Sequence, residues 1–168
     1  MKPIKIGIAG MGTVASGVVK VLERNQAEIT RRAGRGIEVA VVCERTPGRA
    51  AHLEERGVEV INDLSQLASH PDVDIVVELI GGYEPARSFV LEAIANGKHV
   101  VTANKALLAE HGNEIFQAAQ DKGVTVAFEA AVAGGIPVIK ALREGLSANR
   151  IEWIAGIING TTNFILSE

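Results

Sequence analysis

Apolar residues along this chain form short continuous runs, separated by stretches in which they recur every three or four positions. Short apolar runs are typical of strands buried on both faces of a parallel sheet. The three-to-four spacing is typical of helices with one apolar face. Strands are predicted at 3–9, 37–43, 58–61, 74–80, 99–103 and 124–128. Helices are predicted from 13 into the low 30s and at 48–57, 64–69, 85–96 and 106–122.

The alternation of strand and helix at short spacing predicts an α/β fold with a doubly wound parallel sheet and right-handed crossovers. The pattern changes after residue 128, where a small, glycine-rich stretch precedes a predicted helix at 137–146 and a predicted strand at 151–158. We therefore expect one domain over residues 1–130 and the beginning of a second over 131–168.

The first strand leads directly into a glycine-rich turn and a helix. Residues 10–15 read G-x-G-x-x-A, the alanine form of the Rossmann dinucleotide-binding fingerprint. Gly10 permits a tight turn, and Gly12 lets the backbone approach a pyrophosphate. The free N–H groups and the positive dipole end of the helix would face the phosphates. The motif therefore predicts that the domain binds a dinucleotide.

Two residues of opposite charge follow the second strand, where a Rossmann domain meets the adenosine ribose. Glu44 would favour NAD by accepting a hydrogen bond from the 2′-hydroxyl, and Arg45 would favour NADP by pairing with the 2′-phosphate. Arg49 lies close enough in sequence to help clamp a phosphate. We expect NADP with NAD tolerated; the alternative is that these are surface charges at a strand end.

Other strands also end in residues suited to a binding site, because ligands of open α/β sheets bind outside the carboxyl ends of the strands. Gly81 and Gly82 follow the strand at 74–80, and Lys105 follows the strand at 99–103. Lys105 by itself would be read as a surface residue. The polar segment 159–163, flanked by apolar residues, has the composition of a loop that contacts substrate.

Glu129 stands in the glycine-rich stretch that follows the last strand of the series. A carboxylate buried there needs a partner. Together with neighbouring backbone carbonyls it could bind a hard cation. A hydrogen-bond donor elsewhere in the chain is an equally good explanation from sequence alone.

Composition excludes several other classes of protein. The 168 residues carry a formal net charge of −3, and no basic cluster indicates nucleic-acid binding. There is one cysteine, Cys43, and the four histidines at 52, 70, 99 and 111 lack the spacing of a zinc site. No signal peptide precedes the first strand, and no apolar run is long enough to span a membrane. We expect a reduced, cytoplasmic protein without a membrane partner.

Five segments together resemble the N-terminal part of homoserine dehydrogenase. They read IGIAGMGTVASG, VVELIGG, GKHVVTANKALLAEHG, EAAVAGGIPVI and GIINGTTNFIL, and they occur in the family's order over the whole chain. The resemblance implies reduction of L-aspartate 4-semialdehyde to L-homoserine with NADPH or NADH. This reaction lies on the pathway to threonine, methionine and isoleucine. The resemblance also implies that residues 1–130 are a Rossmann domain and that 131–168 begin an α+β substrate-binding and dimerisation domain.

The resemblance assigns roles to residues at matching positions. Lys105 would contact both cofactor and substrate and so belong to the catalytic site, while Thr161 would contact the substrate. A monovalent cation, Na⁺ or K⁺, would be held by Glu129 and the backbone of Val132, Gly134 and Ile136. The residues expected along the cofactor are Gly10, Gly12, Thr13, Val14, Arg45, Ile80, Gly81, Lys105 and Gly160.

The family continues well beyond the length of this chain. The continuation holds a second lysine, the family's proton donor, together with the dimer contacts. We therefore expect this chain to be part of a longer homodimer or higher homo-oligomer and, alone, to bind cofactor with little or no activity. Two alternatives remain at this point. One is another Rossmann oxidoreductase acting on sugars or polyols; the other is a non-catalytic NAD(P)-sensing domain.

Overall fold

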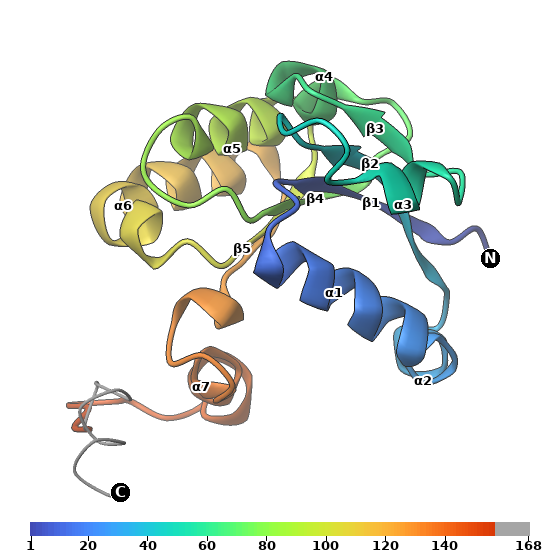
Figure 1. The fold of residues 1–168 in the computed structure, drawn as a ribbon. Coiled ribbons are helices and arrows are strands. Elements are labelled where there is room, and N and C mark those ends of the chain that lie inside the picture. The colour runs from blue at the N-terminus through green and yellow to red at the C-terminus, as the bar shows by residue number, and fades with distance from the viewer. Residues whose placement is uncertain (157–168) are drawn as a thin grey trace, which may run out of the picture.

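The computed structural model describes residues 1–156 and confirms the α/β prediction (Figure 1). In this part of the chain, parallel strands form one sheet in the order β3-β2-β1-β4-β5-β6. The order winds outward in two directions from β1 and β4, as in a Rossmann fold. The strands are β1 (Ile4–Ala9), β2 (Ile37–Cys43), β3 (Glu59–Ile61), β4 (Ile75–Glu78), β5 (His99–Thr102) and β6 (Val126–Ala127).

Helices cover both faces of the sheet, as Figure 1 shows. Side chains of α4, α5 and α6 join one buried cluster on the sheet, and those of α1 and α3 join the other. The helices of this domain are α1 (Thr13–Arg24), α2 (Gln26–Ala33), α3 (Ala51–Glu54), α4 (Leu64–Ser69), α5 (Ala86–Ala95) and α6 (Lys105–Lys122).

The prediction of one continuous helix from residue 13 into the low 30s is wrong. The helix divides at Asn25, whose φ of −107° and ψ of 18° lie outside helical geometry. Asparagine is a poor residue for a helix interior because its side chain competes for backbone hydrogen bonds. The short helix expected at 48–57 is also reduced to α3, with turns on both sides.

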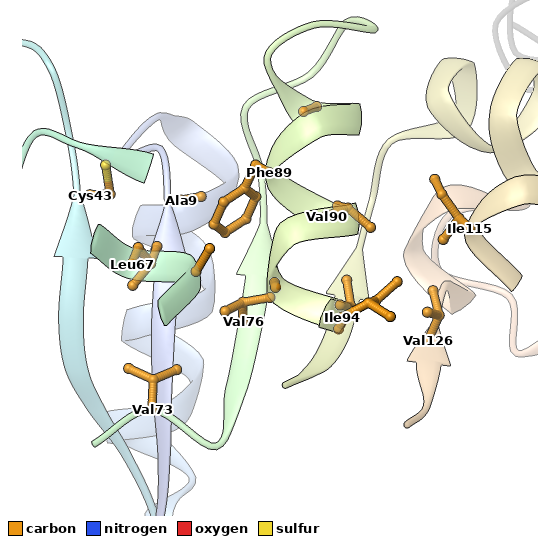
Figure 2. Close-up of a cluster of buried hydrophobic side chains, with 14 of the residues drawn as sticks. Ala9, Cys43, Leu67, Val73, Val76, Phe89, Val90, Ile94, Ile115 and Val126 are labelled. Carbon is orange, nitrogen blue, oxygen red and sulfur yellow. The ribbon is translucent and has the colours of Figure 1, made fainter. Parts of the chain in front are cut away.

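The larger core cluster lies between the sheet and helices α4 to α6 (Figure 2). Figure 2 shows Phe89, Val90 and Ile94 of α5 facing the sheet, with Val76 of β4 beneath them. Burying each of the larger side chains contributes roughly 1.5–3 kcal/mol. The absence of a side chain at Gly7 in β1 lets α4 pack closely, because a Cβ there would lie 2.5 Å from Leu67 Cδ1.

Residues 129–156 follow the sheet with little regular structure. A 3₁₀ turn (Glu129–Ala131) precedes α7 (Val138–Lys140), which continues as a π-helical turn (Ala141–Gly145), so the helix predicted at 137–146 is present in mixed form. The strand predicted at 151–158 is wrong for residues 151–156, which form no regular element. An extended segment becomes a strand of a sheet only when a neighbouring strand accepts and donates its backbone hydrogen bonds. No described strand pairs with residues 151–156. Residues 157–158 lie outside the described part of the chain. The division at residue 130 stays a prediction.

Within residues 1–156, none of the helices combines the length and the hydropathy required to cross a lipid bilayer.

Candidate functional site

The carboxyl ends of β1, β2 and β4 meet at a cleft of about 260 Å³. The sheet order reverses between β1 and β4, and this switch point is where open α/β sheets bind ligands. Four of the predicted cofactor residues line this one cleft: Gly10, Gly12, Arg45 and Ile80. A larger hollow of about 610 Å³ lies near the amino ends of β4 and β5, beside Ile75 and His99, and contains no predicted site residue.

The two glycines of the fingerprint differ in what surrounds them. Gly10 has a φ of +90°, and a Cβ there would lie 3.0 Å from the carbonyl oxygen of Leu79. Its N–H donates to the Cys43 carbonyl at 2.8 Å, which ties the turn to β2. At Gly12, by contrast, a Cβ would meet nothing within 4 Å. Gly10 is therefore required by the turn itself, whereas Gly12 borders open space.

The N-terminus of α1 opens at the same place. Gly12 caps the helix without a side-chain hydrogen bond, and no acidic residue stands in the first turn. The first N–H groups of a helix have no partner inside the helix. The predicted residues Thr13 and Val14 begin this helix. The arrangement suits an anionic group, which would accept hydrogen bonds from these amides.

Glu44 serves the protein's own backbone. One carboxylate oxygen accepts from the Met11 N–H at 2.8 Å and the other from the Thr46 N–H at 2.7 Å, and the side chain is 8% exposed. Burial alone would raise the pKa of Glu44, but these hydrogen bonds and the charge of Arg49, 3.9 Å away, outweigh it and hold the pKa below its usual value. Glu44 therefore joins β2 to the glycine turn as a carboxylate.

Arg45 and Arg49 stand exposed at the rim of the cleft. Among residues 1–156, no ion pair involves Arg45, while Arg49 makes the long contact with Glu44. Glu44 and Arg45, the adjacent acid and base of the sequence analysis, therefore have different roles. The carboxylate of Glu44 is hydrogen-bonded to the turn, and Arg45 is exposed where it lines the cleft.

A second buried carboxylate, Glu78, escaped the sequence analysis. It is fully buried at the end of β4, and its Oε1 accepts from the N–H groups of Ile80 at 2.8 Å and Gly81 at 3.1 Å. Its Oε2 accepts from the Thr102 hydroxyl at 2.6 Å. In sequence it is one polar position in an apolar run; the signal that could have found it is the requirement that a buried carboxylate be hydrogen-bonded.

Lys105 is exposed at the first position of α6 and does not line the cleft at the glycine turn. It borders a separate hollow of about 320 Å³, lined also by Phe116, Phe128 and Val132. Asn104 precedes it as the N-cap of α6, its side-chain oxygen accepting from the Leu107 N–H at 3.1 Å. The structure therefore brings the glycine turn, Arg45 and Ile80 together, and places Lys105 at the end of the neighbouring strand.

Glu129 has hydrogen-bond donors within the chain. Its two carboxylate oxygens accept from the N–H groups of Ile139 and Lys140, each at 2.9 Å. The carbonyl of Ile136, another predicted cation ligand, accepts from Val138 N–H at 2.8 Å. Each of these oxygens has a further lone pair, so the Glu129 carboxylate and the Ile136 carbonyl are also compatible with binding a monovalent cation. The cation stays a prediction. Gly160 and Thr161 lie outside the described residues.

Comparison with known proteins gives a consistent family. The family model described as "Homoserine dehydrogenase, NAD binding domain" matches residues 10–129, and the model "Homoserine dehydrogenase" matches residues 137–168. The homoserine dehydrogenase of Pseudomonas aeruginosa is 65% identical over 168 residues, and that of Neisseria gonorrhoeae is 56% identical over the same length. Each alignment covers 100% of this chain and 38% of the relative.

A solved structure agrees with these matches. The crystal structure of a homoserine dehydrogenase from Thiobacillus denitrificans superposes with a TM-score of 0.91 at 63% sequence identity. It covers 99% of this chain and 38% of the solved chain. The chain thus spans 38% of the length of these relatives, and its fold is that of the corresponding part.

Proposed function

The chain belongs to the homoserine dehydrogenase family, and from this premise we propose that it supplies the NAD(P)-binding part of an enzyme that reduces L-aspartate 4-semialdehyde to L-homoserine. The observation that carries the proposal is the cleft at the switch point of the sheet, where the glycine turn, the N-terminus of α1 and Arg45 converge. The family match disfavours the alternatives of a sugar or polyol oxidoreductase and of a sensing domain.

The cleft supports one direction for the cofactor. The pyrophosphate would lie against Gly12, where the backbone has open space and the amides of Thr13 and Val14 are at hand. The adenosine ribose would then reach Arg45, and the nicotinamide half would reach Ile80 and Gly81 at the end of β4. The cleft runs between these strand ends, so both halves of the dinucleotide would contact residues at its wall.

The bound nicotinamide supplies the hydride, and the residues of this chain orient it and stabilise charge. Lys105 is an exposed cation beside the loop that follows β4 and would stabilise the alkoxide that develops on the aldehyde oxygen. Thr161 and Gly160 would contact substrate and cofactor, and the lysine that donates the final proton is expected beyond residue 168. Proton donation of this kind contributes typically about 10²–10⁴-fold.

NADPH is the proposed preference. Both oxygens of Glu44 already accept backbone hydrogen bonds, whereas Arg45 is exposed at the rim and free of ion pairs among the described residues. A 2′-phosphate would pair with this guanidinium through charge-assisted hydrogen bonds. Calorimetric titration of the chain with NADPH and, separately, with NADH tests the assignment.

The variant for this test is Arg45→Ala. NADPH affinity is expected to fall about tenfold or more, as one charged hydrogen-bonding contact is lost, while NADH affinity stays within about twofold. Arg35→Ala, an exposed arginine beside the hollow near the amino ends of β4 and β5, is the matched control and should change neither. Equal or tighter binding of NADH by the original chain would transfer the ribose contact to Glu44, and binding of neither would refute the cofactor site.

Three further expectations stay predictions. The monovalent cation at Glu129 would be tested by titrating Na⁺ or K⁺ against the original chain and Glu129→Gln. Assembly of the whole protein into a homodimer or higher oligomer would be tested by light scattering. Cytoplasmic localisation would be tested by fractionating cells.

A further inference from the structure

We propose that Glu78 is a positioning residue that holds the loop after β4 and the start of α6 in one geometry, so that the nicotinamide half of the cofactor and Lys105 are placed together. The proposal rests on the proposed function, because it concerns how that site is organised. It assigns a role to a carboxylate that does not line the cofactor cleft.

The hydrogen bonds around Glu78 form a closed circuit between two loops. Glu78 binds the N–H groups of Ile80 and Gly81, and the Thr102 hydroxyl donates to its other oxygen at 2.6 Å. Thr102 Oγ1 in turn accepts from the Asn104 N–H at 3.0 Å. The Asn104 side-chain amide donates back to the Gly82 carbonyl at 2.7 Å. Each loop is therefore fixed at two points, once through Glu78 and once through Asn104.

The arrangement costs more folding free energy than a purely structural role requires. Glu78 and Thr102 are fully buried, Asn104 is 7% exposed, and none of the described ion pairs places a cation beside the carboxylate. A buried carboxyl group whose partners are all neutral donors costs folding free energy that an apolar residue of similar size would avoid. The position of Glu78 explains why a polar residue is buried there, since its hydrogen-bond circuit ends on the two segments that would meet the nicotinamide and the substrate.

The circuit also fixes where Lys105 starts. The side chain of Asn104 caps α6 through the Leu107 N–H, and the same side chain is bound to Gly82. A shift of the loop after β4 would thus be passed to the first turn of α6. Because Thr102 both accepts and donates within the circuit, removing its hydroxyl disconnects Glu78 from Asn104, while each residue keeps its other hydrogen-bond partners.

The test uses Thr102→Val, which has the same shape without the hydroxyl, and Thr102→Ser as the matched control that keeps it. Two ligands are titrated into each variant by calorimetry: NADPH and 2′,5′-ADP, which contains only the adenosine bisphosphate half. Thr102→Val should weaken NADPH by up to about tenfold, since the lost hydrogen bond is worth at most about that much and binding must then order the two loops, and it should change 2′,5′-ADP by less than about twofold. Thr102→Ser should bind both as the original chain does.

The comparison of two ligands separates positioning from general loosening. Equal weakening of both ligands by Thr102→Val, or unchanged NADPH affinity, would overturn the positioning role. If the original chain binds neither ligand, the cofactor proposal itself fails and this inference fails with it. Should Thr102→Val not fold, Asn104→Ser removes the amide that donates to Gly82, adds no charge and keeps an N-cap oxygen for α6; it should show the same selective loss of NADPH.

Discussion

The two glycines of the fingerprint should respond in opposite ways to the same substitution. Gly12→Ala adds a methyl group where nothing lies within 4 Å, at a φ of −84° that any residue adopts. Loss of unfolded-state entropy stabilises by about 0.4–1 kcal/mol, and alanine is a poorer N-cap than glycine by a similar amount. The fold should therefore keep its stability to within about 1 kcal/mol, while the pyrophosphate loses its place against the backbone.

Gly10→Ala should instead damage the fold. Its φ of +90° is strained for alanine, and the new Cβ would lie 3.0 Å from the Leu79 carbonyl oxygen. Backbone strain of this kind costs about 1–3 kcal/mol, and the contact with the carbonyl of Leu79, just after β4, adds to it. The melting temperature should fall by about 2–12 °C from the strain alone, taking 2–4 °C per kcal/mol for a chain of this size.

Thermal unfolding and NADPH calorimetry on both variants make the test. Gly12→Ala should melt within about 4 °C of the original chain and bind NADPH at least about tenfold more weakly, which corresponds to 1.4 kcal/mol. Unchanged NADPH affinity in Gly12→Ala would show that the pyrophosphate does not lie against Gly12. A Gly10→Ala variant with unchanged melting temperature would show that the turn does not need its positive φ.

Two predictions concern stability. The pKa of Glu44 in the folded chain lies below its unfolded value, so the stability that Glu44 contributes is lost as pH falls through the folded pKa. In urea unfolding, the difference in unfolding free energy between the original chain and Glu44→Gln should therefore narrow from pH 7 to pH 3. A difference that stays constant with pH would contradict this prediction. Asp63 caps α4 by accepting from the Ser65 N–H at 2.9 Å, so Asp63→Ala should cost about 1 kcal/mol in the same assay with unchanged NADPH binding.

The order of strands and helices could be predicted because the parallel strands are apolar on both faces and the helices on one. The run at 74–80 is an example: β4 forms its centre and lies between β1 and β5. Boundaries were less predictable. The division at Asn25 depends on one residue's backbone angles, and the strand expected at 151–158 depends on a pairing partner that the apolar pattern does not specify.

Site residues could be predicted where they lie in one short segment, and not where segments distant in sequence come together to form the site. The glycine turn is local, so Gly10 and Gly12 could be assigned from spacing. Glu78 and Thr102 are 24 residues apart, and their hydrogen bond exists only because β4 and β5 are neighbours in register. Similarly, the side-by-side charges of Glu44 and Arg45 left the ribose contact open, and only the contact of Glu44 with Met11 separates their roles.

The two carboxylates at the strand ends have the same consequence for the ligand. Glu44 and Glu78 both accept hydrogen bonds from N–H groups of the loops around them, so each holds backbone that the ligand would contact. The exposed side chains left at the rim include Arg45 and Arg49, although the chain as a whole has a net charge of −3. A local cationic rim on an acidic chain attracts a polyanion. Loss of Glu44 should therefore weaken NADH and NADPH alike, by loosening the glycine turn, and only loss of Arg45 should distinguish them.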